Sequence, residues 1–298
     1  MHFGSYALSF LIGSAILSTF AINLFGVALE QVRPVQKIPL RQRLLGMWFA
    51  AFQMAVIYAA APLLFALAAL AASSTVGGLI PLPAHGWRLS ISLIVYFGAM
   101  DFLEYWRHRA EHSISWLWTL HSFHHDDRTV NAFTTQRVFW LSPIVQYLMV
   151  MPIMCALFRA PPMVISLWFI AETILRATNH LNLRVGFGRL TLWIMGPQYH
   201  LIHHSMNLEH RDRNFANMFP VWDWLFGTAY VPASDEFPQT GLIEMPAAAR
   251  FIDAFWWPAR LRVASRAPAS GAAPANESEL PGVGIQAGED GTLQTSRI

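Results

Sequence analysis

The histidines of this sequence are its clearest candidates for chemistry. Ten of the twelve lie between residues 108 and 210, and most of these ten fall in three short clusters. One cluster has the form HxxxH and two have the form HxxHH. The clustered residues are His108, His112, His121, His124, His125, His200, His203 and His204, and the single ones are His180 and His210.

This spacing predicts metal binding. Residues three or four apart lie on one face of a helix, so each cluster can direct two or three imidazoles to one point. Neutral imidazole binds Zn, Cu, Fe and Ni. The eight clustered histidines together with His180 are too many for one tetrahedral zinc ion, which takes four ligands. We therefore expect two metal ions that share these histidines. A lone HxxxH could be two surface histidines on a helix, and the recurrence of the pattern favours metal.

The composition predicts a membrane protein. Of the 298 residues, 54% are hydrophobic and 13% are charged, against roughly 25% charged in a soluble domain. The formal net charge of +2 is too small to indicate a nucleic-acid-binding surface. A single cysteine, Cys155, excludes disulfides within the chain, iron–sulfur clusters and Cys-rich zinc modules.

Apolar runs specify the fold class. A helix needs about 20 residues to cross the hydrocarbon core of a bilayer. The candidate runs are 5–28, 45–72, 89–106, 138–158 and 161–175. We expect an all-α integral membrane protein with about four or five transmembrane or re-entrant helices. The last two runs form either two full spans or a re-entrant hairpin. The first is expected to be a retained helix, because it carries neither a basic leader nor an Ala-x-Ala cleavage site.

Basic residues predict the orientation. The loop after the first run carries Arg33, Lys37, Arg41 and Arg43, whereas residues 73–87 contain no Lys or Arg. By the positive-inside rule the first loop is cytoplasmic. The histidine clusters then form a cytoplasmic, histidine-rich helical cap.

Three regions follow from this organisation. N-terminal membrane helices occupy residues 1–90, a histidine-box domain occupies 91–232, and a C-terminal tail occupies 233–298. The tail is expected to be disordered from about residue 264, because it is rich in Ala, Pro, Gly and Ser and has no aromatic side chain there. The bacterial inner membrane is the favoured location, and the endoplasmic reticulum also fits this topology.

Several motifs together resemble the fatty acid hydroxylase/sterol desaturase superfamily over residues 95–232. The motifs are HRAEH at 108–112, HSFHH at 121–125, NH at 179–180, HLIHH at 200–204, DRNF at 212–215 and WDWLFGT at 222–228. Straight-chain acyl desaturases usually begin with HxxxxH, so the HxxxH here favours the hydroxylase/sterol desaturase branch. The resemblance implies a non-haem di-iron centre that hydroxylates or desaturates a lipid with O₂ and two electrons.

The resemblance also assigns roles. It implies that the eight clustered histidines bind iron, with His180 as a ninth ligand. His210 matches no motif, and we expect it at the surface or beside a ligand. The sequence has no nucleotide, flavin or c-type haem motif. Electrons must therefore come from a partner, such as a ferredoxin or a cytochrome b5-like protein with its reductase.

Carboxylates near the first cluster are candidates for orienting ligands. Asp101 and Glu104 share a helical stripe with His108 and His112. A metal-bound histidine commonly donates its other N–H to a carboxylate. Asp101 or Glu104 is therefore expected in that role. The alternative is a helix-end carboxylate that reaches headgroup water or pairs with Arg107.

Two further polar pairs have expected roles. Asp212 and Asn214, in the motif after the third cluster, are expected to form hydrogen bonds with ligands. Glu172 and Arg176 are spaced as a favourable helix ion pair.

Two functions from different classes remain. The first is lipid oxidation, with hydroxylation preferred to desaturation, and with sterols, fatty acyl chains, ether lipids and carotenoids all open as substrates. The second is a non-catalytic metal-binding or metal-transporting membrane protein. Transporters usually place their ligands on broken helices at the bilayer midplane. The positions of the clusters at predicted helix ends favour the first function.

Overall fold

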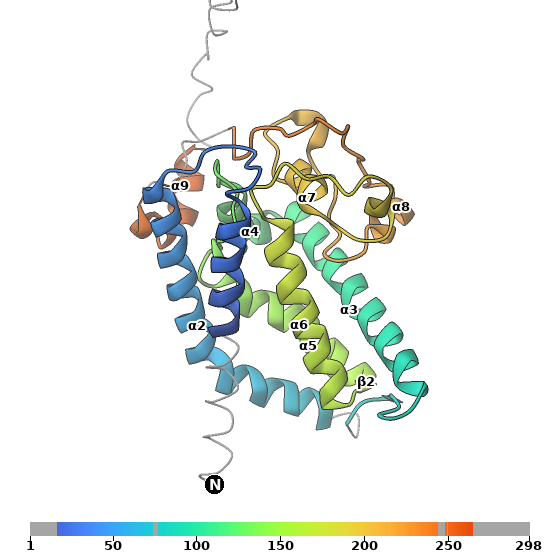
Figure 1. Cartoon of the computed structure of the whole chain (residues 1–298). Helices are drawn as coiled ribbons and strands as arrows, with labels where there is room; N and C mark the ends of the chain where they lie inside the picture. Colours follow the sequence, from blue (N-terminus) through green and yellow to red (C-terminus); the bar gives the residue numbers. More distant parts are fainter. Residues whose placement is uncertain (1–16, 74–76, 244–247, 249, 265–298) are drawn as a thin grey trace, which may run out of the picture.

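The structure is a computed structural model, and it describes residues 17–73, 77–243, 248 and 250–264. The expected disorder beyond residue 264 lies outside these residues, as does the start of the apolar run 5–28. The chain folds into a bundle of long helices with shorter helices and loops gathered at one end, which we call the cap (Figure 1).

The first two helices lie side by side. One covers Leu17–Leu29 and the next, α2, covers Leu40–Ser73. The carboxylate of Glu30 accepts a hydrogen bond from Arg43 at 2.6 Å and ties the start of α2 to the end of the preceding helix. Pro62 lies inside α2, and the ribbon changes direction in the lower part of this helix (Figure 1). A proline bends a helix because it removes one backbone hydrogen bond and crowds the preceding turn.

The next segment carries the chain from the far end of the bundle to the cap. Strand β1 (Ile80–Pro81) precedes α3 (Arg88–Ser113), which rises through the bundle to the cap (Figure 1). Ile114 has an extended conformation and separates α3 from α4 (Ser115–His125). This single extended residue redirects the chain, so α4 lies across the end of the bundle.

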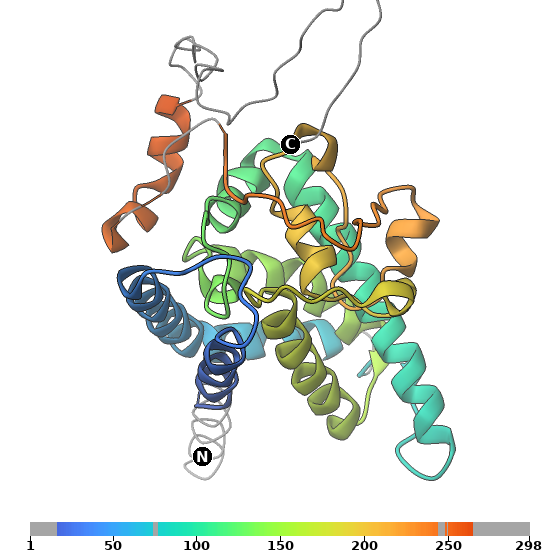
Figure 2. The same ribbon diagram turned by 45° about the horizontal axis from the view of Figure 1, so that its top comes forward.

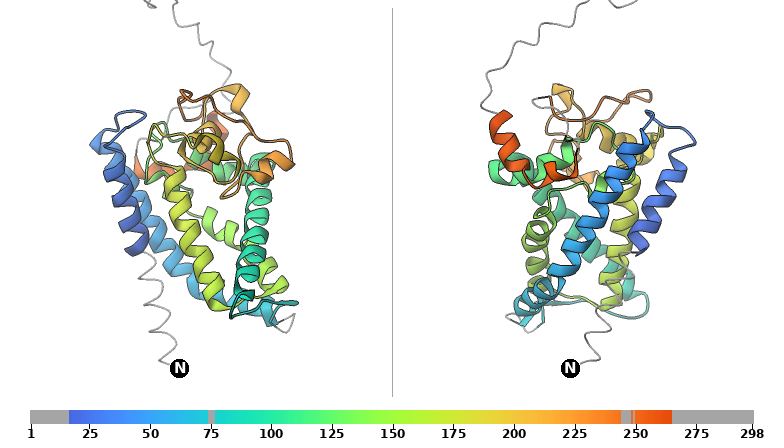
Figure 3. Two further views of the ribbon diagram at one scale, coloured as in Figure 1. Left: turned by 45° about the vertical axis from the view of Figure 1, so that its right-hand side comes forward. Right: turned by 90° about the vertical axis from the view of Figure 1, so that its left-hand side faces the viewer.

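Helix α5 leads the chain away from the cap, and helix α6 returns it to the cap (Figure 3). After the short helix η1 (Thr134–Gln136), α5 covers Ser142–Leu157, strand β2 covers Phe158–Arg159 and α6 covers Pro162–Asn179. Strands β1 and β2 pair in parallel, with Ile80 opposite Phe158 and Pro81 opposite Arg159. This pairing fixes the turn between α5 and α6 beside the start of α3, at the end opposite the cap (Figure 3).

The cap is built mainly from the last third of the described chain. Its elements are η2 (Gly188–Leu192), α7 (Pro197–His203), η3 (Leu208–His210), α8 (Val221–Leu225), η4 (Phe251–Ala254) and α9 (Trp257–Ala264). Figure 2 shows α7 and α8 above α3, and α9 at the other side near α4.

Two clusters of buried side chains hold these parts together. In the bundle, Met100 of α3, Met154 of α5 and Trp168 of α6 belong to one core. Below the cap, Phe123 of α4 packs with Phe49 of α2 and with Trp257 of α9. The indole N–H of Trp257 also donates a hydrogen bond to Ser122 at 2.9 Å. The second core therefore fixes the histidine-bearing helix α4 against α2 and α9.

The bundle has apolar outer surfaces. Among the described residues, the segment Leu40–Leu70 is the one helix long and apolar enough to cross a membrane, and Leu17–Leu29 and Ser142–Leu157 are shorter apolar helices. Large apolar side chains on several helices face outward, including Leu63 of α2, Ile94 of α3 and Ile170 of α6. The fold is thus mainly helical, as expected, with one clear candidate span.

Candidate metal centre

The nine histidines expected to bind metal come together at the junction of bundle and cap. They form two groups, and within each group one ring nitrogen per residue lies within 4.8 Å of all the others. We call them the five-histidine group and the four-histidine group. The first contains His108, His112, His121, His125 and His203, and the second contains His124, His180, His200 and His204.

Each HxxHH cluster contributes to both groups. In the first, His121 and His125 belong to the five-histidine group, whereas His124 belongs to the four-histidine group. In the second, His200 and His204 share the four-histidine group, and His203 joins the other. Successive residues of a helix point about 100° apart, so adjacent histidines diverge while those four apart stay together. Each HxxHH cluster therefore supplies ligands to both groups, whereas its spacing predicted that all of its imidazoles converge on one point.

The turn between α3 and α4 assembles the five-histidine group. It brings His108 Nε2 to 3.1 Å from His121 Nε2, and His112 Nε2 to 3.2 Å from His125 Nε2. His121 Nε2 and His125 Nε2 are 3.1 Å apart. Helix α7 supplies His203 from the opposite side, with its ring centroid 4.4 Å from that of His108.

The end of α6 and helix α7 assemble the four-histidine group. His180 Nε2 lies 3.1 Å from His124 Nε2 and 2.9 Å from His200 Nε2. His204 Nε2 lies 3.2 Å from His200 Nε2. Pro197 occupies the first turn of α7, where its fixed φ suits a helix start and its missing N–H costs no hydrogen bond.

Backbone carbonyls fix the proton positions of three histidines. The Nδ1 atoms of His108, His180 and His203 lie 2.8 Å from the carbonyl oxygens of Phe215, Arg176 and Arg213, respectively. A carbonyl can only accept, so each Nδ1 carries the proton and each Nε2 presents a lone pair. These lone pairs point into the two groups, as ligand atoms must.

Burial keeps the rings in the form that binds metal. Removal from solvent is the largest cause that lowers the pKa of His124 well below its usual range, and the same holds for His203. Burial likewise lowers the pKa of His180 to about 4. The lowered pKa values favour neutral rings, and in His180 and His203 the bond from Nδ1 to a carbonyl leaves Nε2 without a proton to displace.

The two groups fit a pair of metal ions. Nitrogen ligands that bind one ion at about 2.0–2.1 Å lie roughly 3 Å from one another, close to the 2.9–3.2 Å separations between Nε2 atoms here. His203 Nε2 is buried without a hydrogen-bond partner in the described part of the chain. A cation would satisfy the lone pairs that face one another, and an all-imidazole set suits Fe, Zn, Cu or Ni.

Glu111 lies beside a histidine of the five-histidine group, and it was not among the carboxylates predicted from the sequence. Its Oε2 lies 3.2 Å from His121 Nδ1 and also accepts a hydrogen bond from Arg107 at 2.5 Å. Gln146 donates to its Oε1 at 3.0 Å. Glu111 lies inside the HRAEH motif, three residues after His108 and directly before His112. This position between two predicted ligands could have identified Glu111 as a residue of the site.

Asp101 and Glu104 have other partners. The Asp101 carboxylate accepts hydrogen bonds from the backbone of Met218 and Phe219 and from the indole of Trp222, at 2.9–3.0 Å. It therefore anchors the loop before α8. Glu104 pairs with Arg107 at 2.6 Å, as in the alternative that the sequence left open. Through Arg107 this carboxylate connects to Glu111.

Asp212 and Asn214 both lie in left-handed backbone, with φ of 56° and 59°. Asp212 Oδ1 is 3.3 Å from His112 Nδ1, and this contact is the largest cause that lowers the pKa of the Asp212 carboxyl. The Asn214 amide instead donates to the carbonyl oxygens of Tyr199 and Tyr230, both at 2.9 Å. Asn214 thus joins α7 to the loop after α8.

Two smaller expectations concern positions around the site. The predicted ion pair between Glu172 and Arg176 is confirmed at 2.9 Å. His210 is buried, and it lies outside both groups, where it contacts Ser205, Tyr230 and Glu236.

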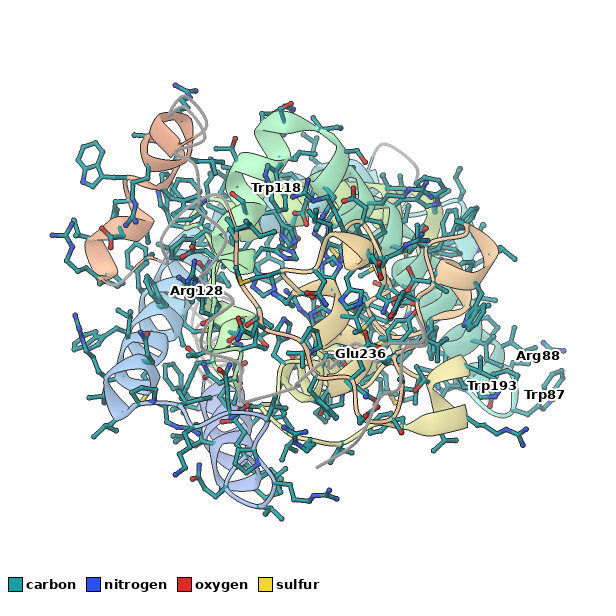
Figure 4. The ribbon with its side chains drawn as sticks, turned by 90° about the horizontal axis from the view of Figure 1, so that it is seen from above. Trp87, Arg88, Trp118, Arg128, Trp193 and Glu236 are labelled. Carbon is teal, nitrogen blue, oxygen red and sulfur yellow. The ribbon has the colours of Figure 1, made fainter. Side chains whose placement is uncertain are left out.

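A cavity of about 590 Å³ opens onto one side of the centre. Its walls include His112, His125 and His203, all from the five-histidine group, together with Trp118 of α4 and Leu261 of α9. Trp118 and Glu236 both lie over the cap when it is viewed from above (Figure 4). A second cavity, of about 30 Å³, borders histidines of both groups from the bundle side. The large cavity therefore reaches the five-histidine group alone.

Comparison with known proteins relates this region to lipid-modifying enzymes. Residues 93–228 match the family model described as fatty acid hydroxylase. Human alkylglycerol monooxygenase is 30% identical over 132 residues, which cover 44% of this chain and 29% of that protein. A very-long-chain aldehyde decarbonylase of Oryza sativa subsp. japonica is 29% identical over 155 residues, covering 50% of this chain and 49% of that one.

A plant sterol enzyme is also similar. The putative Delta(7)-sterol-C5(6)-desaturase 2 of Arabidopsis thaliana is 29% identical over 171 residues, covering 51% of this chain and 57% of that protein. The matched stretch spans about a third of the alkylglycerol monooxygenases and about half of the plant proteins. No solved structure matches the chain.

Proposed function

We propose that this chain, in which residues 93–228 form a domain of the fatty acid hydroxylase/sterol desaturase superfamily, is a membrane-bound non-haem di-iron oxygenase that hydroxylates, or alternatively desaturates, a lipid C–H bond. O₂ is the second substrate, and two electrons come from a partner. One observation carries the proposal: nine imidazoles, eight of them buried, converge as two adjacent groups, and backbone carbonyls at Nδ1 leave the Nε2 lone pairs of His108, His180 and His203 facing inward.

The chain's own residues prepare the site in three ways. The two groups would hold one iron ion each, and the bound iron would supply the activation of O₂. Backbone carbonyls and Glu111 orient the rings. The cavity on the bundle side, about 30 Å³, can hold water but is too small for a lipid chain.

The large cavity is the proposed site of the lipid. It combines apolar walls, such as Trp118, Leu242 and Leu261, with hydroxyl groups of Ser115 and Thr119. Such a lining suits an apolar chain near a polar head. The reacting carbon would then approach the five-histidine group, which this cavity reaches. The names of the relatives favour an oxidised lipid and leave ether lipids, sterols and acyl chains as candidates.

We also propose a multi-pass membrane topology with the histidines on the cytoplasmic side. Helix α3 is about 39 Å long at 1.5 Å per residue, enough for a core of roughly 30 Å, whereas α5 is about 24 Å and would need a thinned or tilted setting. Trp87, at the far end of α3, and Trp193, in the cap, are both highly exposed. They lie at the same edge of the molecule when it is viewed down the bundle (Figure 4). Exposed tryptophans at both ends suit the two membrane interfaces.

Three regions and an electron donor complete the proposal. Residues 1–90 and 91–232 would act as membrane helices and histidine domain, with 233–298 as the C-terminal tail. A ferredoxin or a cytochrome b5-like protein would supply electrons. A bacterial inner membrane remains the favoured location.

Elemental analysis of detergent-purified protein tests the proposal. We expect about two irons per chain after anaerobic loading, loss of lipid oxidation in both His200→Ala and His203→Ala, and loss of iron in His200→Ala, whose group has no fifth imidazole. His85→Ala is the matched control, because His85 is exposed and outside both groups. Folded protein that repeatedly binds no iron would contradict the di-iron assignment and favour a different metal-handling role. An unchanged yield of oxidised lipid in His203→Ala would also contradict it.

A further inference from the structure

A second polar cluster lies beside the metal centre and takes no part in ligand binding. Ser205 Oγ is 2.9 Å from His210 Nδ1, and His210 Nε2 is 3.0 Å from Glu236 Oε1. Tyr230 also donates its hydroxyl proton to Glu236 Oε1, at 3.0 Å. The His210 side chain is 2% exposed and that of Glu236 is 23% exposed. A hydroxyl, an imidazole and a carboxylate therefore form a chain that runs from the protein interior to its surface.

The carboxylate fixes the orientation of the histidine. An ionised carboxylate only accepts hydrogen bonds, so His210 Nε2 carries a proton directed at Glu236. His210 Nδ1 then faces the Ser205 hydroxyl with either a lone pair or a proton. Nδ1 is thus the atom that can gain and lose a proton, while Glu236 stabilises the protonated ring, as the acid of a catalytic triad does.

The position of Ser205 connects this chain to the site. Ser205 follows His204 directly and lines the same large cavity as His112, His125 and His203. On the far side, Glu236 is held in place because its Oε2 accepts a hydrogen bond from the backbone of Ala233 at 2.9 Å. One end of the cluster thus borders the proposed lipid site, and the other meets solvent.

We propose that Ser205, His210 and Glu236 form a proton-transfer triad that serves oxygen reduction in the cavity. The inference rests on the proposed function. His210 holds a proton at Nδ1 and passes it to Ser205 Oγ as the Ser205 hydroxyl proton moves into the cavity. The neutral ring that remains keeps its Nε2 proton, directed at Glu236. After the product leaves, Nδ1 takes up a proton through the Ser205 hydroxyl from water that re-enters the cavity.

The overall reaction requires such a source. Hydroxylation balances as R–H + O₂ + 2 e⁻ + 2 H⁺ → R–OH + H₂O, with the electrons supplied by a reduced one-electron carrier protein. The C–H bond breaks, one oxygen atom enters the product, and the other leaves as water with the two protons. An apolar chain in the cavity displaces water, so protons held by the protein become the supply close to the oxygen.

The first test uses metal-free protein and needs no turnover. Protein labelled with ¹⁵N-histidine is compared with its His210→Gln variant by NMR, and the signals missing from the variant belong to His210. We expect Nε2 to be protonated in the neutral ring and the Nδ1 signal to shift in Ser205→Ala. A neutral His210 with its proton on Nδ1 and a bare Nε2 would overturn the triad.

The second test uses iron-loaded enzyme with a donor system and lipid. Positioned acid–base groups contribute typically about 10²-fold or more, so His210→Gln and Ser205→Ala should lower kcat by that factor with KM little changed. Both should raise hydrogen peroxide released per lipid oxidised, and Glu236→Gln should act in the same direction. Thr173→Val is the matched control, because it removes a hydroxyl bonded to the Phe169 carbonyl on α6, outside the linings of both cavities. This control should keep the peroxide ratio of the wild type.

The outcomes separate the two proposals. A wild type that oxidises lipid, with His210→Gln and Ser205→Ala equal to it in kcat and in peroxide ratio, would overturn the triad and leave the proposed function intact. A wild type that binds iron yet oxidises no lipid would contradict the proposed function and with it the use of the triad. The NMR result would then still decide the proton positions.

Discussion

The two histidine groups have the same donor atoms and different surroundings. Three members of the five-histidine group border the large cavity, and its other members are held by the Phe215 carbonyl and by Glu111. Of these two cavities, the four-histidine group borders the small one on the bundle side and not the large one. Three of its Nδ1 atoms, those of His124, His200 and His204, have no hydrogen-bond partner in the described chain. In the five-histidine group this holds for Nδ1 of His121, which lies 3.2 Å from the Glu111 carboxylate.

This difference indicates that the two groups have different roles. The five-histidine group faces the space in which a substrate can bind, and it has one imidazole in reserve. The four-histidine group borders the small cavity on the bundle side and has no fifth imidazole among its described members. We infer that the reaction takes place at the five-histidine group, which we call the open group. The four-histidine group, which we call the enclosed group, is inferred to need every one of its ligands to hold a metal ion.

The largest expected effect comes from removing one ligand from each group. His200→Ala leaves three imidazoles in the enclosed group, whereas His112→Ala leaves four in the open group. We expect His200→Ala to weaken binding of one iron by more than about 100-fold, beyond the 10–100-fold typical of groups that only orient ligands. His112→Ala should retain more iron. Both variants should fail to oxidise lipid.

The measurement is iron per chain at increasing free iron, under anaerobic conditions, with helicity recorded to establish folding. Equal iron retention in the two variants, or greater loss in His112→Ala, would remove the distinction between the groups.

A smaller effect is expected at Glu111, which orients only the open group. Glu111→Gln removes the carboxylate beside His121 Nδ1 and should lower iron affinity by about 10–100-fold. Glu104→Gln is the matched control, because Glu104 pairs with the same Arg107 without an ion-pair contact to a histidine. Titration with Fe(II), alongside thermal unfolding, separates a loss of metal affinity from a loss of stability. Equal iron affinity in the two variants would show that Glu111 stabilises Arg107 and does not orient a metal ligand.

Much of this site could be predicted from the sequence, because histidine spacing is a local property. All nine histidines selected by spacing and resemblance lie in the two groups. Their division between the groups depends on how α4 and α7 face each other across the site, which is a tertiary property. The pairing of His108 with His121, for example, follows from the extended Ile114 between two helices.

The polar residues around the ligands were harder to predict for the same reason. Asp101 lies on the predicted stripe, yet its oxygens reach the backbone of Met218 and Phe219, more than 100 residues away in the chain. Glu111 lies two turns after Glu104 on the same side of α3, and it meets His121 only because α4 folds back over it. Helical periodicity describes one helix at a time, and these contacts join two elements.

The smallest expected effect is at Asp212, the carboxylate at the solvent side of the open group. Its side chain is 60% exposed, and its Oδ1 lies 3.3 Å from His112 Nδ1. Water therefore competes for hydrogen bonds with the carboxylate and the imidazole and screens their interaction. Asp212→Asn keeps the shape and removes the charge, and we expect iron affinity to fall by less than about 10-fold, below the effect of Glu111→Gln. Fe(II) titration of the two variants in parallel measures the difference. A larger loss in Asp212→Asn than in Glu111→Gln would mean that His112, at the mouth of the cavity, depends on its orienting carboxylate more than the buried His121 does.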